Sequence, residues 1–99
     1  MTYEDLQAAL RLFGLGERAT LREIKARHRE LVKRHHPDTG AGDPEAIRRV
    51  NAAYRLLADY VSSYRFSFSE DEFYEQNPEA RLWRQFMSDP FGGAGPRPR

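Results

Sequence analysis

The chain has no cysteine among its 99 residues, which excludes disulfides, thiol catalysis and any zinc site built on cysteine. Such a composition is typical of proteins that work in a reducing compartment, and we expect a cytoplasmic location. No apolar run approaches the roughly 20 residues that a membrane-spanning helix needs. The amino terminus is acidic and lacks the basic start of a secretory signal. The sequence therefore predicts no membrane partner.

The usual patterns of a catalytic or metal site are missing as well. There is no Gly-rich phosphate loop, and every serine lies at or beyond Ser62, outside any nucleophile-elbow pattern. His28, His35 and His36 are candidate metal ligands, but the carboxylates near them do not have the sequence spacing of a metal site. We interpret His28 and His35 as partly buried substitutes for aromatic residues. We expect no enzyme activity, no metal and no cofactor.

Charge is unevenly distributed along a chain whose formal net charge is only +1. Residues 20–35 carry six basic and two acidic side chains, a local balance of +4, whereas residues 66–90 carry two basic and six acidic ones, a balance of −4. The basic stretch has two interpretations, a docking face or an ordinary solvated helix surface. The opposite charges also allow a hypothesis in which the acidic segment lies near the basic helix and competes there with a docking partner.

Capping signals and apolar periodicity predict three helices in the first 62 residues. The first follows Thr2 and ends at Gly14, the second follows Thr20 and stops before Pro37, and the third is capped by Asp43. The expected fold is all-α, an antiparallel pair of the second and third helices with the first laid across it. The apolar positions predicted to form the stripes of these helices are Tyr3, Leu6, Leu10, Phe13, Leu21, Ile24, Leu31, His35, Ile47, Val50, Ala53, Tyr54 and Leu57.

The most informative motif is His36-Pro37-Asp38, which lies between the second and third predicted helices. Proline cannot continue a helix, and it pushes the preceding residue away from helical geometry. A Gly-rich turn over residues 39–42 follows. The tripeptide is therefore predicted to be displayed at the mouth of a helical hairpin.

The C-terminal third has a different character. The alternation of Tyr64, Phe66 and Phe68 predicts a short extended segment, after which Ser69 opens a brief helix and Asn77-Pro78 begins another. On this last helix, one side carries the apolar residues Leu82, Trp83, Phe86 and Met87. We expect them to pack back on the first three helices; the alternative is a surface for a client or partner protein, or for self-association.

These residues together resemble a J domain, the module of DnaJ-type co-chaperones. The likeness covers about residues 4–62, and its matching residues are Gly14-Leu15, Glu23-Ile24-Lys25, Leu31, His36-Pro37-Asp38, residues 51–57 and Asp59. Without a cysteine-rich zinc region or a long Gly/Phe segment, the chain resembles a minimal J-domain protein. The predicted organisation is a J domain over 1–65, a C-terminal helical extension over 66–90, and a disordered Gly/Pro/Arg tail over 91–99. We expect a monomer.

The resemblance implies a co-chaperone that docks on a DnaK-type chaperone and stimulates its ATP hydrolysis. It implies that Asp38 engages an arginine of the chaperone, while His36 and Pro37 hold the loop in shape. Basic residues of the second helix would meet an acidic surface of the nucleotide-binding domain, next to a small apolar patch. The residues implied for these two contacts are Lys25 and Arg29, and His28, Val32 and Ile47.

Two further interpretations of the function remain open. A small helical nucleic-acid-binding module would use residues 20–35 as a recognition helix. The almost neutral net charge and the Pro37-Asp38 turn count against a nucleic-acid partner. The other interpretation is a J-like scaffold that has lost chaperone contact and only tethers partners. The intact His36-Pro37-Asp38 tripeptide argues against it. Departures from the family pattern at Glu30 and at Thr39-Gly40 bear on which chaperone is selected.

Overall fold

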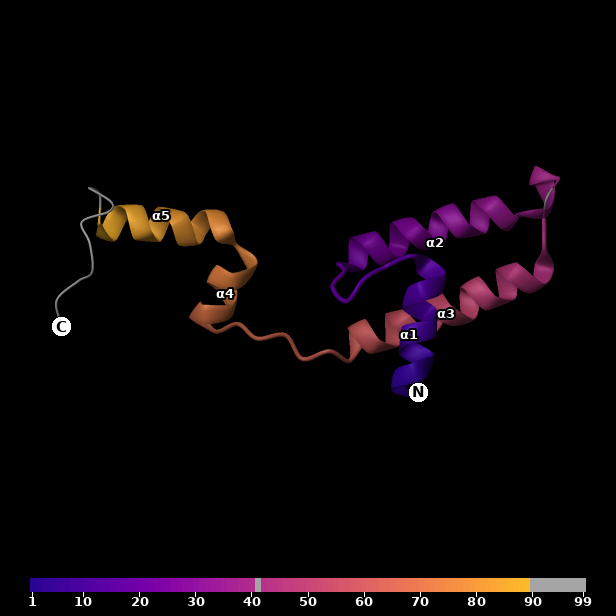
Figure 1. Cartoon of the computed structure of the whole chain (residues 1–99), viewed down its shortest axis with the longest axis horizontal. Coiled ribbons are helices and arrows are strands. Elements are labelled where there is room, and N and C mark those ends of the chain that lie inside the picture. The colour runs from indigo at the N-terminus through magenta and orange to yellow at the C-terminus, as the bar shows by residue number, and fades with distance from the viewer. Residues whose placement is uncertain (41, 90–99) are drawn as a thin grey trace. The chain divides into compact units, whose positions relative to one another are not determined.

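The computed structural model describes residues 1–40 and 42–89 and is all-α over these residues, as predicted (Figure 1). Its helices are α1 (Tyr3–Phe13), α2 (Leu21–His35), α3 (Pro44–Ser62), α4 (Glu70–Gln76) and α5 (Pro78–Ser88), with a 3-10 turn, η1 (Pro37–Thr39), between α2 and α3. The predicted disordered tail over 91–99 lies outside the described residues, as does Ala41 of the predicted turn.

The chain divides into two compact units, and the boundary follows Tyr64. Unit 1, Met1–Tyr64, contains α1, α2, η1 and α3. Unit 2 begins at Arg65 and contains α4 and α5.

Helix starts in unit 1 follow the capping signals of the sequence. The Thr2 hydroxyl accepts a hydrogen bond from the Asp5 N–H at 3.0 Å, and the Asp5 carboxylate accepts from the Thr2 N–H at 3.1 Å. Thr20 and Glu23 repeat this reciprocal arrangement at the start of α2. Two otherwise unpaired backbone donors are satisfied at each helix start. These short local signals explain why the predicted starts match the observed ones.

The core of unit 1 lies where α2 and α3 run side by side and α1 crosses them (Figure 1). Its fully buried side chains include Phe13, Val50 and Leu57, one from α1 and two from α3. Burying an apolar side chain of this size stabilises a fold by roughly 1.5–3 kcal/mol. The remaining members of the buried cluster are Ala9, Ile24 and Leu31.

Four positions differ from the predicted apolar stripes. Tyr3 and Leu21 were predicted to face the core, but they are 66% and 42% exposed. Both lie in the first turn of a helix, and the neighbouring helices do not cover that turn. Ala9 and Ala46 are buried instead, because small side chains let packed helices approach closely. Alanine carries too little hydrophobic signal to be picked out by periodicity alone.

Unit 2 is a short helix pair in which none of the described residues is buried. The Ser69 hydroxyl accepts a hydrogen bond from the Glu72 N–H at 3.2 Å and so caps α4 as predicted. The Asn77 side chain donates to the carbonyl of Phe73 at 2.8 Å, so it closes α4 rather than capping α5. The aromatic residues preceding α4 are exposed, and Phe68 reaches 93%.

The expected packing of the apolar side of α5 on the first three helices stays a prediction. Among the described residues, no helix combines the length and the apolar character that crossing a membrane requires.

Candidate protein-docking site on the second helix and the adjoining turn

The turn after α2 is shaped by its proline and closed by a backbone hydrogen bond. His36 leaves the helix with φ −68° and ψ 140°, the extended geometry that a following proline favours. Pro37 then opens η1, where its missing N–H removes no needed hydrogen bond. At the base of the loop the Asp43 N–H donates to the carbonyl of His35 at 3.1 Å. The loop between these two residues is thus held as a closed turn.

Within the turn, His36 supports the backbone that presents Asp38. His36 Nδ1 accepts a hydrogen bond from the Asp38 N–H at 3.2 Å. In the neutral imidazole, this hydrogen bond places the ring proton on Nε2. His36 Nδ1 also lies 3.5 Å from Asp38 Oδ2. The Asp38 side chain is 91% exposed, and its carboxylate is presented to solvent.

Gly42 is a residue of this site whose importance the sequence pattern did not indicate. A β-carbon on residue 42 would lie 2.7 Å from the Pro37 N and 2.9 Å from the carbonyl carbon of His36, and closer still to the Pro37 Cα. Real β-carbons do not approach backbone atoms so closely, so only glycine fits here without a shift of the turn. The only sequence signal was its place in a Gly-rich turn just before a helix cap.

Beside the turn, α2 presents three basic residues on one face. Lys25, Arg29 and Lys33 follow each other at intervals of four residues, which places them in a row along a helix. All three are exposed. Such a row interacts weakly with any single acidic partner residue in salt, but it orients and accelerates the approach of an acidic surface.

An open, largely apolar hollow of about 490 Å³ lies next to this row and ends at the turn. We call it the α2 hollow; it is lined by His28, Arg29, Val32, Lys33 and His36. Of the predicted site residues, four therefore meet around one surface. Lys25, Pro37, Asp38 and Ile47 do not line it, and Ile47 is half-buried on α3. Lys33 joins the site although sequence reasoning had counted it only as part of the basic stretch.

His28 ties the wall of the hollow to the core of unit 1. Its ring stacks on Tyr54 with a centroid distance of 4.0 Å and an interplanar angle of 10°. It is also parallel to the Phe13 ring, with the centroids 6.4 Å apart. His28 Nε2 lies 2.9 Å from Asn51 Oδ1, within hydrogen-bond distance. His28 is thus half-buried and stacks as an aromatic side chain would, and His35 is half-buried as well.

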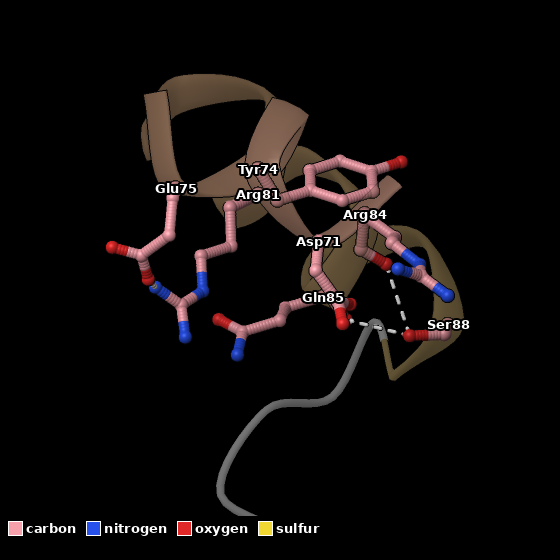
Figure 2. A pocket seen from close by; sticks show the side chains of 7 residues that line it. All are labelled: Asp71, Tyr74, Glu75, Arg81, Arg84, Gln85 and Ser88. Carbon is pink, nitrogen blue, oxygen red and sulfur yellow. Dashed lines mark hydrogen bonds and ion pairs between the residues drawn. The ribbon is translucent and has the colours of Figure 1, made fainter. Parts of the chain in front are cut away.

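A second hollow, of about 410 Å³, lies between α4 and α5 in unit 2 (Figure 2). Among its lining residues, Arg81 Nη1 lies 3.6 Å from Glu75 Oε1, and Arg84 Nη1 lies 3.5 Å from Oε2 of Glu70, which does not line the hollow. Such exposed pairs join the two helices and are each worth about 0–1 kcal/mol. Over residues 1–40 and 42–89, no three His, Asp or Glu side chains are grouped as metal ligands would be.

Comparison with known proteins finds a family model and several relatives. The family model for the DnaJ domain matches residues 10–65, which include α2, the turn and α3. The chain is 35% identical over 65 residues to a chaperone protein DnaJ of Finegoldia magna, an alignment that covers 63% of this chain and 18% of the relative. It is 33% identical over 84 residues to a DnaJ-like protein of Mycoplasma pneumoniae, covering 79% of this chain and 27% of that one.

A chaperone protein DnaJ of Chlamydia trachomatis is 37% identical over 87 residues, which are 85% of this chain and 20% of the relative. The chain thus spans less than a third of the length of these three relatives. No solved structure matches it.

Proposed function

Because this chain belongs to the DnaJ domain family, we propose that it docks on a DnaK-type chaperone and stimulates the chaperone's ATP hydrolysis. The observation that carries the proposal is the exposed Asp38 carboxylate, held on a closed turn between two packed helices. A charge-assisted hydrogen bond from a partner arginine is stronger than a neutral one and depends on geometry. A carboxylate on a preformed turn offers such a contact without first being ordered.

The α2 surface supplies the rest of the proposed contact. Arg29 and Lys33 edge an apolar hollow, so a partner surface that combines carboxylates with apolar side chains would match it. The basic row steers the encounter, and Asp38 acts after docking. Stimulation further requires that the contact stabilise the hydrolysing state of the chaperone more than its resting state, because equal binding to both states shifts no population.

Steady-state ATP hydrolysis by the host's own DnaK-type chaperone tests the proposal. We expect the wild-type chain to raise the hydrolysis rate several-fold and Asp38→Asn to leave it at the basal value. Glu17→Gln is the matched control, because it removes an exposed carboxylate from the segment between α1 and α2. A wild-type chain without stimulation would refute the proposal, and so would stimulation that survives in Asp38→Asn.

Chemical-shift mapping on addition of the chaperone locates the contact independently. We expect the changes at Arg29, Lys33 and residues 36–38. Changes confined to unit 2 would show that the site is misplaced, whatever the hydrolysis assay gives.

A further inference from the structure

The two helices of unit 2 face each other through polar side chains. Glu70 and Glu75 of α4 form ion pairs with Arg84 and Arg81 of α5, and the Arg84 guanidinium lies 4.9 Å from the centre of the Tyr74 ring. Figure 2 shows Tyr74, Glu75, Arg81 and Arg84 of this set on the side where the two helices face each other. Both arginines of α5 are therefore engaged on the side that faces α4.

The opposite side of α5 is apolar and is not covered by α4. Leu82, Trp83, Phe86 and Met87 are 65%, 62%, 54% and 68% exposed. Their spacing by one, four and five residues places them on one face of a helix. The Trp83 and Phe86 rings already make an edge-to-face pair, with centroids 5.8 Å apart. A face that gathers four large apolar side chains, in a unit that buries none of its described residues, is typical of an interaction site.

The charge on this face of α5 restricts which kinds of molecule can bind there. Glu79 precedes Leu82 and Trp83 by three and four residues, so it lies on the same side of α5. The described part of α5 has only Arg81 and Arg84 as cations, and both point to α4. An acidic group beside the apolar anchors repels lipid phosphates and nucleic acid. A second copy of this face would bring a second Glu79 and no cation to meet the first.

We propose that α5 is a docking helix whose apolar face enters an apolar groove on a folded partner protein. The partner carries a lysine or arginine at the groove edge, where it meets Glu79. Leu82, Trp83 and Phe86 are the anchors, and Trp83 is the energetic centre because large aromatic anchors dominate such interfaces. By binding this partner, α5 localises unit 1 to one particular protein. The inference goes beyond the proposed chaperone contact and does not depend on it.

Site-specific photo-crosslinking in host cells tests the inference on the full chain. The photoreactive residue p-benzoylphenylalanine replaces Phe86 on the apolar face or, as the matched control, Gln85 on the side that faces α4. We expect one discrete adduct from position 86 and none from position 85. The adduct is identified by mass spectrometry, and the protein found in it is purified.

Binding of that purified protein to the chain is then measured for three variants. We expect the dissociation constant to rise about tenfold or more for Trp83→Ala and for Glu79→Lys. Arg11→Ala, on α1, should leave it unchanged. Changing the partner's groove-edge cation to glutamate should restore binding of Glu79→Lys. Because α5 buries none of its residues, the substitutions leave the core of unit 1 intact, and a circular dichroism melt verifies this.

Several results would overturn the inference. They are an adduct with a second copy of the chain, with unit 1 of the same chain, with lipid, or with a broad mixture of unfolded polypeptides. Equal labelling from positions 85 and 86, or no adduct from position 86, would do the same.

Discussion

A β-carbon on Gly42 would lie 2.7 Å from the backbone nitrogen of Pro37, so the segment that enters α3 passes against the backbone of the displayed tripeptide. The contact joins the two ends of the turn. Its geometry makes the position of Asp38 depend on a residue four places further along the chain. The turn is thus held at its base by the Asp43–His35 hydrogen bond and from the side by Gly42.

Gly42→Ala should therefore displace the turn. We expect chemical-shift changes at residues 36–38 and a loss of chaperone stimulation of about tenfold, which corresponds to about 1.4 kcal/mol. Gly16→Ala is the control, because a β-carbon there has nothing within 4 Å. Stimulation by Gly42→Ala equal to that of the wild type would contradict a positioning role. In the Asp38→Asn background, Gly42→Ala should cause no further loss.

The stack of His28 on Tyr54 should contribute to the stability of unit 1. We expect His28→Ala to lower the free energy of unfolding by about 1–3 kcal/mol, because it loses the stack and the contact with Asn51. A double-mutant cycle with Tyr54→Leu should give a coupling energy of about 0.5–1.5 kcal/mol. Denaturant unfolding measures both quantities. A coupling near zero would show that the rings lie together without attracting each other.

Acid should weaken the start of α2. The Thr20 backbone N–H, and next its hydroxyl, hydrogen-bond to the Glu23 carboxylate and lower its pKa below the ordinary value of 4.5. A pKa lowered in the folded state stabilises the fold above 4.5, and that stabilisation is lost as the pH falls through the folded pKa.

Thr20→Ala tests this dependence. At neutral pH we expect a loss of about 1 kcal/mol for the missing cap. The difference in unfolding free energy between wild type and variant should narrow as the pH is lowered from about 7 to about 3.5. The reason is that a protonated Glu23 carboxyl is a poor acceptor for the hydrogen bond from the Thr20 hydroxyl. A difference that stays constant over this range would mean that the hydrogen bond from the Thr20 hydroxyl to the Glu23 carboxylate adds no pH-dependent stability. Thr2 and Asp5 form a second pair with the same direction of shift.

Charge reversal on α2 should separate docking from stimulation. Arg29→Glu is expected to raise the chain concentration for half-maximal stimulation about tenfold at low salt, and less at high salt, because screening weakens the wild-type attraction. The maximal stimulation should be retained. Arg27→Glu is the control: it makes the same charge change two residues away, on a different side of the helix. Equal effects of the two variants would indicate a response to net charge rather than a defined contact.

How much of the site was predictable depends on the reach of each interaction. Thr2, Thr20 and Asp43 mark helix starts through hydrogen bonds that span two or three residues, and those helix starts agree with the sequence. Pro37 ends α2 for a reason contained in its own ring. The all-α class and the display of the tripeptide followed from these local effects.

The rest is decided by residues distant in the sequence. The packing of α2 against its neighbours determines which of its faces is buried. For this reason the His28 ring stacks on Tyr54, and Lys33 lines the α2 hollow. Glu70 and Glu75 draw the arginines of α5 toward α4 and leave its apolar side outward. Short-range patterns therefore determined where the helices begin and end and what the turn displays. Only the tertiary structure decided which side chains share a surface, because burial and close approach are properties of pairs that the chain brings together when it folds.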